Sequence, residues 1–253
     1  MSWTKTNFPM AMVGSGGPSE GLWTPTVDQL HRLGEKYDDS LGRRWRYARN
    51  GAAILAAGYM SGKEATHANV LDEAQTSYGT AAIGDTRVTV VVATGNGITN
   101  DELIDGTLLV EDSTGYLHAY AIAGNTYITS DTIMSVELHD PIRVAWSATT
   151  VITLSKNMYA DVVVMGTTPT GIACGVPNVA IPIGYYGWLQ RKGPCAMYAD
   201  TGTTLAIGCL CGNPTAATTA GSVEATAVDE ALYGHVIEIG AQTKGCLIYL
   251  QLE

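Results

Sequence analysis

Short runs of β-branched and aromatic residues, each ended by glycine, asparagine or aspartate, recur through most of this chain of 253 residues. Runs this short and this closely spaced favour the strands of a barrel or a sandwich, because an α/β sheet would need a long helical pattern between successive strands. The sequence therefore predicts an all-β protein. The predicted strands include residues 86–92, 106–110, 116–122, 142–146, 150–154, 185–194, 234–240 and 246–250.

The composition agrees with this prediction. Charged residues make up 15% of the chain and glycine contributes 29 residues, which favours strands and tight turns over long helices. We expect two small β-barrel or β-sandwich modules, since domains usually hold about 100 to 200 residues. The expected parts are an extended arm with a short helix at 1–40, a first module at 41–165, a linker at 166–184 and a second module at 185–253.

The first 25 residues carry large aromatic side chains but show neither helical nor strand periodicity. Trp3, Phe8 and Trp23 stand among three prolines and several glycines. Such a segment cannot build a core by itself, and a solvated tail usually carries fewer aromatic residues. We therefore expect an arm that becomes ordered against a neighbouring subunit, with an unanchored terminus as the alternative.

A short helix is expected at residues 26–33. Thr26 and Gln29 have the spacing of a capping box, apolar residues recur every three positions, and Gly34 can close the helix. A helix of about two turns depends on packing against another element.

The clearest local pattern in the N-terminal part lies at residues 43–56. Arginine and aromatic side chains alternate over residues 44–47, as on a strand with two different faces. An Asn-Gly pair follows at 50–51, the pair best suited to a two-residue type I′ turn, and residues 52–56 supply a return strand. The sequence therefore predicts a β-hairpin here.

The net charge of −10 is distributed unevenly: residues 1–63 carry eight Lys or Arg against five Asp or Glu, and the remainder is strongly acidic. This balance argues against general nucleic-acid binding, because phosphate contacts need a concentrated cationic surface. The basic and aromatic residues of the N-terminal part fit contact with an acidic protein surface, with nucleic-acid stacking and a solvated hairpin as the alternatives. The predicted partner-binding residues are Trp3, Phe8, Trp23, Arg43, Arg44, Trp45, Arg46 and Arg49.

No motif in the chain points to catalysis or to a bound cofactor. The five cysteines contain no CxxC pair and the five histidines show no metal-binding spacing, so buried thiols and ordinary histidines are the favoured interpretation. Adjacent acids such as Asp101-Glu102 fit solvated turns, with a Ca²⁺ site there or at residues 112–115 and a glycoside hydrolase as the alternatives. We expect no enzyme, no cofactor, and no catalytic or metal-binding residue.

The chain also lacks the features of a membrane or secreted protein. No run approaches the roughly 18 to 20 apolar residues of a spanning helix, and the first residues lack the apolar stretch of a secretion signal. We expect a soluble protein made in the cytoplasm, without a membrane partner.

Two stretches resemble structural proteins of tailed bacteriophages, in particular those that decorate the capsid. The first reads DSLGRRWRYARNGAAILAAG over residues 39–58 and is similar to the N-terminal hairpin of such proteins. The second begins with YGWLQRKGP at 186–194, continues with GTTLAIG at 202–208 and closes with GHVIE at 234–238, and it is similar to their C-terminal β-domain. Together the two stretches cover about a third of the chain.

The resemblance to this capsid-decoration (head cement) family implies a non-enzymatic protein that binds the major capsid protein on the outside of an icosahedral head. It implies a homo-oligomer, often a trimer, located on the virion and in the host cytoplasm during assembly. The arm would lie on the shell, so removal of residues 1–25 is expected to weaken attachment without unfolding the modules. The alternatives are a tail or head-fibre component that recognises a host surface, and a carbohydrate-binding or carbohydrate-hydrolysing β-protein.

Overall fold

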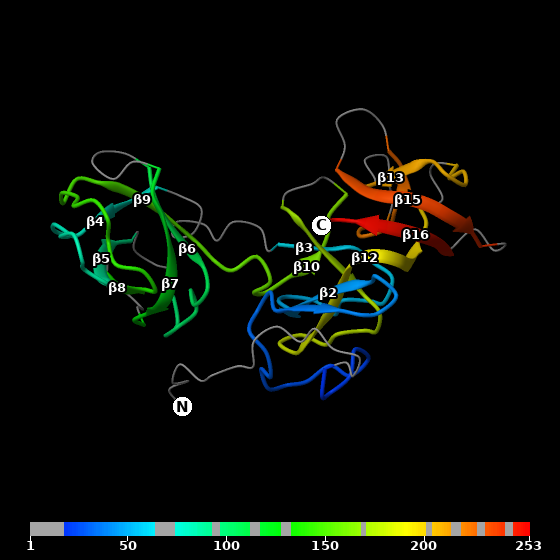
Figure 1. Cartoon of the computed structure of the whole chain (residues 1–253), viewed down its shortest axis with the longest axis horizontal. Helices are drawn as coiled ribbons and strands as arrows, with labels where there is room; N and C mark the ends of the chain where they lie inside the picture. The colour runs from blue at the N-terminus through cyan, green and yellow to red at the C-terminus, as the bar shows by residue number, and fades with distance from the viewer. Residues whose placement is uncertain are drawn as a thin grey trace. The chain divides into compact units, whose positions relative to one another are not determined.

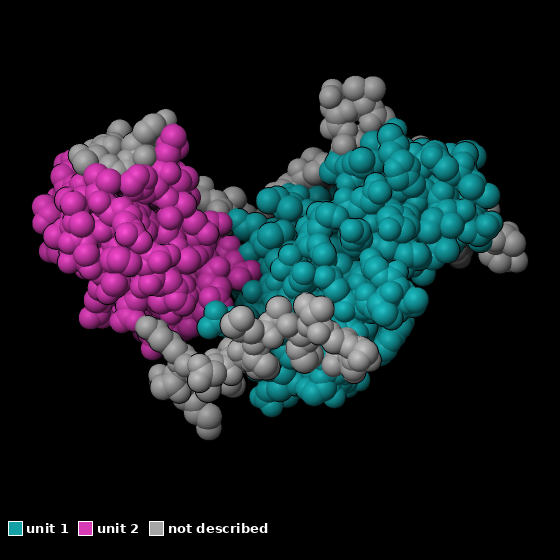
Figure 2. Space-filling view, in the orientation of Figure 1, with its two compact units in different colours: residues 1–65, 158–253 teal, residues 66–157 magenta. Residues whose placement is uncertain are grey.

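The computed structural model of the protein is built from strands, as the sequence predicts (Figure 1). Within the described residues there is no helix, and therefore none that is long and apolar enough to cross a membrane. The chain forms two compact units, one made of residues 1–65 and 158–253 and the other of residues 66–157 (Figure 2). The described residues are 18–63, 74–92, 97–111, 117–127, 133–167, 171–200, 204–213, 219–226, 231–240 and 245–253.

The boundaries of the units differ from the predicted modules. The second unit is an insertion into the first, so residues 41–65 belong with the C-terminal part of the chain and not with a module at 41–165. The predicted linker at 166–184 contains a strand, β11 (Ala173–Pro177), of the first unit's sheet. Strand pairing between residues far apart in sequence causes both differences, and local patterns carry no signal for such pairing.

The second unit is a closed barrel whose six strands all pair with antiparallel neighbours in the order β4-β5-β8-β7-β6-β9. Three consecutive strands, β6, β7 and β8, lie side by side, and β9 returns beside β6, which is a Greek-key arrangement. Closure leaves no edge strand. The strands are β4 (Ala74–Ser77), β5 (Arg87–Val91), β6 (Thr107–Val110), β7 (Ala119–Asn125), β8 (Ile133–Leu138) and β9 (Val151–Ser155).

The core of the barrel follows from the alternation of its strands. Val88 and Val90 of β5 point inward, and alternating apolar residues of β6, β7, β8 and β9 join them in one apolar cluster. The predicted strand at 142–146 is not a strand, although Ile142 and Trp146 at its ends are buried in this cluster. The indole N–H of Trp146 donates to Ser77 Oγ at 3.1 Å, which satisfies the one polar atom of a buried tryptophan.

The first unit is a single ten-stranded sheet, curved into a half-barrel, in which all pairs of strands are antiparallel. Its main path runs β10-β3-β11-β12-β16-β15-β13-β14, and β2 joins β12 from the side and carries β1. Besides β11, the strands are β1 (Lys36–Asp38), β2 (Arg44–Arg49), β3 (Ser61–Gly62), β10 (Val163–Val164), β12 (Tyr186–Tyr198), β13 (Leu210–Gly212), β14 (Glu224–Ala225), β15 (Leu232–Ile239) and β16 (Gly245–Gln251).

Strand β12 connects the two halves of this sheet. Its first half pairs with β2 and β11, and its second half, from Lys192 to Tyr198, pairs with β16. The register shifts between Gln190 and Lys192, where the ladder to β2 ends. The Gln190 side-chain amide donates to the carbonyls of Lys192 and Pro194 at 3.1 and 2.8 Å, so the backbone stays hydrogen-bonded through the irregular stretch.

The predicted hairpin at residues 43–56 was wrong in its second half. The alternation over β2 is confirmed, but residues 52–56 do not return beside it, and neither residue of the Asn50-Gly51 pair has the positive φ of a type I′ turn. Asn50 is buried and its Nδ2 donates to Ile181 O at 2.7 Å. A Cβ on Gly51 would lie 2.7 Å from Asp161 O. The absence of a side chain at Gly51 therefore allows the backbone at Asp161 to pass close by.

The expected helix at residues 26–33 is absent, and this prediction was also wrong. The backbone of Thr26 instead pairs with Tyr186 of β12, with N···O distances of 3.0 and 2.8 Å. The N–H of Leu30 donates to the hydroxyl of Tyr47 at 3.2 Å. These long-range partners compete successfully with a two-turn helix, which has little stability of its own.

The close approach of β15 and β16 gives a test of the fold. A Cβ on Gly234 would lie 2.0 Å from Tyr249 O, so Gly234→Ala is expected to lower the free energy of unfolding by about 1–3 kcal/mol. Gly245→Ala on β16 is the control, because a Cβ there meets no atom of the described residues within 4 Å. Urea denaturation monitored by tryptophan fluorescence measures both variants, and equal midpoints would contradict the close approach.

Candidate partner-binding surface

The structure separates the residues that the sequence predicts to bind a partner. Trp3 and Phe8 lie outside the described residues. Trp23 is 61% exposed, whereas Trp45 is 1% exposed and belongs to the core. Trp45 is therefore not available to a partner. The predicted arginines, Arg43, Arg44, Arg46 and Arg49, all form ion pairs within the first unit.

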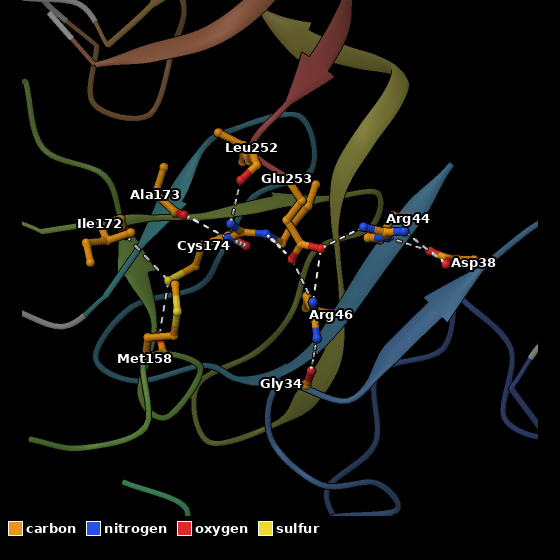
Figure 3. A network of polar contacts seen from close by, with 11 residues as sticks. Gly34, Asp38, Arg44, Arg46, Met158, Ile172, Ala173, Cys174, Leu252 and Glu253 are labelled. Carbon is orange, nitrogen blue, oxygen red and sulfur yellow. Dashed lines mark hydrogen bonds and ion pairs between the residues drawn. The ribbon is translucent and has the colours of Figure 1, made fainter. Parts of the chain in front are cut away.

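Three arginines converge on the side chain of Glu253 (Figure 3). Arg46 binds it with two donors, Nε to Oε1 at 2.7 Å and Nη2 to Oε2 at 3.0 Å. Arg44 Nη1 lies 3.2 Å from Oε2, and Arg191 Nε lies 2.9 Å from Oε1. Burial alone would raise the pKa of the Glu253 carboxyl, but hydrogen bonds and charges from these arginines hold that pKa below its usual value.

Further contacts fix the orientation of each arginine in this network. Arg44 binds Asp38 with Nε–Oδ1 and Nη2–Oδ2 distances of 2.7 and 3.2 Å. Arg46 Nη1 donates to Gly34 O at 2.9 Å. The Arg191 guanidinium donates to the carbonyls of Ala173, Cys174 and Leu252 at 2.9 to 3.0 Å. The network therefore ties β2, β11 and β12 to the residues after β16, and its arginines stabilise the sheet.

An aromatic cluster of Tyr37, Trp45, Tyr47 and Trp188 lies on the face of β2 opposite to Arg44 and Arg46. The rings of Tyr47 and Trp188 meet edge to face with centroids 5.2 Å apart, and those of Tyr37 and Trp45 lie 5.6 Å apart. The guanidinium of Arg43 covers Trp45 at 5.0 Å from the ring centroid. The aromatic side chains of the alternating pattern thus belong to the core. The sequence showed that they share one face of β2, but not that this face is buried.

A buried histidine joins the N-terminal segment to this cluster. His31 packs against the rings of Tyr47 and Trp188, with centroids 5.0 and 5.2 Å away. Its Nε2 lies 3.0 Å from Glu20 Oε1, and its Nδ1 lies 3.3 Å from Glu35 Oε1. The indole N–H of Trp188 also donates to Glu20 Oε1 at 2.9 Å. Glu20 and His31 therefore hold residues 20–31 firmly against the sheet, a role that no sequence motif indicated.

A groove of about 410 Å³ runs along β12 in the first unit. Trp23, which is 61% exposed, lines the groove together with the polar residues Arg43, Asn178, Gln190 and Tyr198. The remaining lining residues are Ala57, Gly58, Pro194, Cys195, Ala196 and Met197. Segments from five parts of the chain build this groove, so the sequence carried no local signal for it.

The cysteines occupy buried positions in the first unit, as the sequence analysis expected. Cys174, Cys195, Cys211 and Cys246 are buried and Cys209 is partly buried, all as free thiols. Burial raises the pKa of the Cys174 thiol to about 12, which makes it a poor nucleophile at neutral pH. Among the described residues, no group of three His, Cys, Asp or Glu side chains could hold a metal ion.

Comparison with protein-family models, with curated proteins and with solved structures gives no match for this chain.

The arginine network predicts a pH-dependent contribution to stability. Glu253→Gln leaves three arginines without their shared carboxylate and is expected to lower the free energy of unfolding at pH 7 by about 1.5–3 kcal/mol. Because the folded-state pKa of Glu253 lies below the ordinary value of 4.5, the difference from wild type should be complete above that pH and shrink as the pH falls through the folded-state pKa.

Denaturation of both proteins at several pH values measures this difference. Glu238→Gln, at an exposed position on β15, serves as the control and should match wild type throughout. A constant difference between pH 7 and pH 3 would argue against a contribution from the ionised carboxylate.

Proposed function

We propose that this chain is a structural protein of a tailed-bacteriophage particle, which attaches to the major capsid protein on the outer surface of the head as a homo-oligomer and reinforces contacts between capsid subunits. The resemblance of residues 39–58 and 186–238 to capsid-decoration proteins suggests this role. The fold supports treating the two stretches together, because β2 of the first and β12 of the second are paired from Arg49↔Tyr186 to Arg44↔Lys192.

The observation that carries the mode of attachment is the anchored N-terminal segment. Glu20 and His31 fix this segment to the aromatic cluster, and between them Val27 and Leu30 are 64% and 40% exposed. Apolar side chains on a rigid segment suit protein contact, because binding them costs little further ordering. This segment follows directly on residues 1–17, which hold Trp3 and Phe8.

The ion pairs of the first unit favour an apolar contact over a basic one. Arg44 pairs with both Asp38 and Glu253, and Arg46 pairs with Glu253. Arg49 Nη1 lies 2.8 Å from Asp161 Oδ1. A partner that used these guanidinium groups would have to replace carboxylates already in place. We therefore assign attachment to residues 1–17 with Val27 and Leu30, and not to the arginines of β2.

Repetition on the particle would strengthen such a contact. Each copy presents a small apolar surface, which gives a weak interaction alone. A homo-oligomer seated on a lattice of identical capsid subunits binds through several contacts at once, and the effective concentration of the later contacts raises the overall affinity.

Attachment can be tested by rebinding to particles. A deletion of residues 1–25 would remove Glu20 and its bonds to Trp188 and His31, so the sharper truncation ends at residue 17. We expect the protein lacking residues 1–17 to melt like wild type and to rebind to stripped capsids at a much lower copy number, measured by gel densitometry of purified particles.

Point variants test the contribution of the anchored segment separately from that of residues 1–17. Val27→Ser with Leu30→Ser should lower occupancy further, whereas Ile83→Ser, at a similarly exposed position in the second unit, should leave it unchanged. Full occupancy by both the truncated and the doubly substituted protein would refute this mode of attachment, and failure of the wild type to rebind at all would refute the proposed function.

A further inference from the structure

We propose that the groove along β12 is a saccharide-binding site, with the indole of Trp23 as the platform on which a sugar ring stacks. This inference goes beyond the proposed function, because the groove lies wholly within the first unit and needs no capsid. Its volume of about 410 Å³ falls within the range of about 300–1,000 Å³ that is common for small-molecule sites. A short saccharide is therefore of suitable size.

Trp23 is unusual among the four tryptophans that the structure describes. Trp45, Trp146 and Trp188 are buried, whereas Trp23 is 61% exposed and lines the groove. Its π-face carries negative charge density, which attracts the weakly polarised C–H groups on one face of a pyranose ring. An exposed indole beside a concave, partly polar wall is therefore suited to a ligand with both C–H faces and hydroxyl edges.

Two of the polar residues of the groove, Arg43 and Tyr198, have planar side chains that are held in place. Arg43 Nε donates to Asp39 Oδ2 at 2.7 Å and its guanidinium stacks over Trp45. Within the described part of the chain, neither Nη atom of Arg43 has a hydrogen-bond partner. The ring of Tyr198 is fixed by stacking on Tyr59, with centroids 5.1 Å apart and an interplanar angle of 15°.

Asn178 completes this polar set. It is only partly buried, and no described residue makes a hydrogen bond to its side-chain amide. An amide and a guanidinium together offer donors and an acceptor in two planes, which matches adjacent hydroxyl groups, each of which both donates and accepts. The groove thus combines one stacking surface with polar groups that are ready to bind.

A peptide fits the same groove less well. An extended peptide would add to the edge of β12 through backbone hydrogen bonds. Pro194 has no N–H, its carbonyl already accepts from Gln190, and the N–H of Tyr198 donates to Gly58 O at 2.9 Å. Few main-chain groups of β12 therefore remain for strand addition, and the exposed side chains favour a polyhydroxylated ligand.

The test uses the isolated full-length protein and named probes. Maltotriose, cellotriose, chitotriose and trigalacturonate are titrated in turn, and binding is followed by saturation-transfer NMR and by quenching of tryptophan fluorescence. We expect at least one trisaccharide to bind with saturation. Trp23→Ala and Asn178→Ala should each weaken that binding by about tenfold or more, with melting temperatures close to wild type because both side chains lie at the surface.

Ile207→Ala is the matched control, since Ile207 is an exposed apolar residue of the first unit that does not line the groove, and it should bind like wild type. Absence of binding by all four saccharides, binding that survives Trp23→Ala, or Trp23-dependent binding of an extended heptapeptide mixture in their place would each overturn the proposal. None of these results bears on capsid attachment, which the particle assay measures separately.

Discussion

The pairing of β12 with strands from both ends of the chain is the constraint on which the first unit depends. Its 13 residues reach from β2 and β11 to β16, and the irregular point at Gln190 lets one strand serve both halves of the sheet. The aromatic cluster, the Glu253 network and the groove all include side chains of this strand or of its direct neighbours. A change that displaced β12 would therefore disturb all three at once.

The all-β class could be predicted from the sequence because burial alternates along each strand, and this alternation is a local property. The partners of each strand could not. Residues 26–33 and the Asn50-Gly51 pair have good local signatures for a helix and a turn. Their backbone groups nevertheless bind those of Tyr186, Tyr185 and Val162, and the Asn50 side chain binds the carbonyl of Ile181. The insertion of residues 66–157 was hidden for the same reason, since long-range pairings such as those of β2 with β12 and of β3 with β11 show it.

The candidate site was predicted in part. The sequence indicated that Trp23 needs a partner, and the structure leaves it exposed. The sequence predicted a cationic surface at the arginines of β2, because their carboxylate partners, above all Glu253, are distant in the sequence. The groove could not be predicted at all, because Trp23, Arg43, Asn178 and Tyr198 meet only when the sheet has formed.

The insertion of the barrel also has a consequence for synthesis on the ribosome. The nascent chain completes residues 66–157 before it reaches β12, so the barrel has all its strands while β2 still lacks its main partner. Domains tend to fold as units as they emerge. During that interval β2 can pair only with β1, so Trp45 and Tyr47 lie on a two-stranded ribbon without Trp188. Transiently exposed apolar surface of this kind is what chaperones bind.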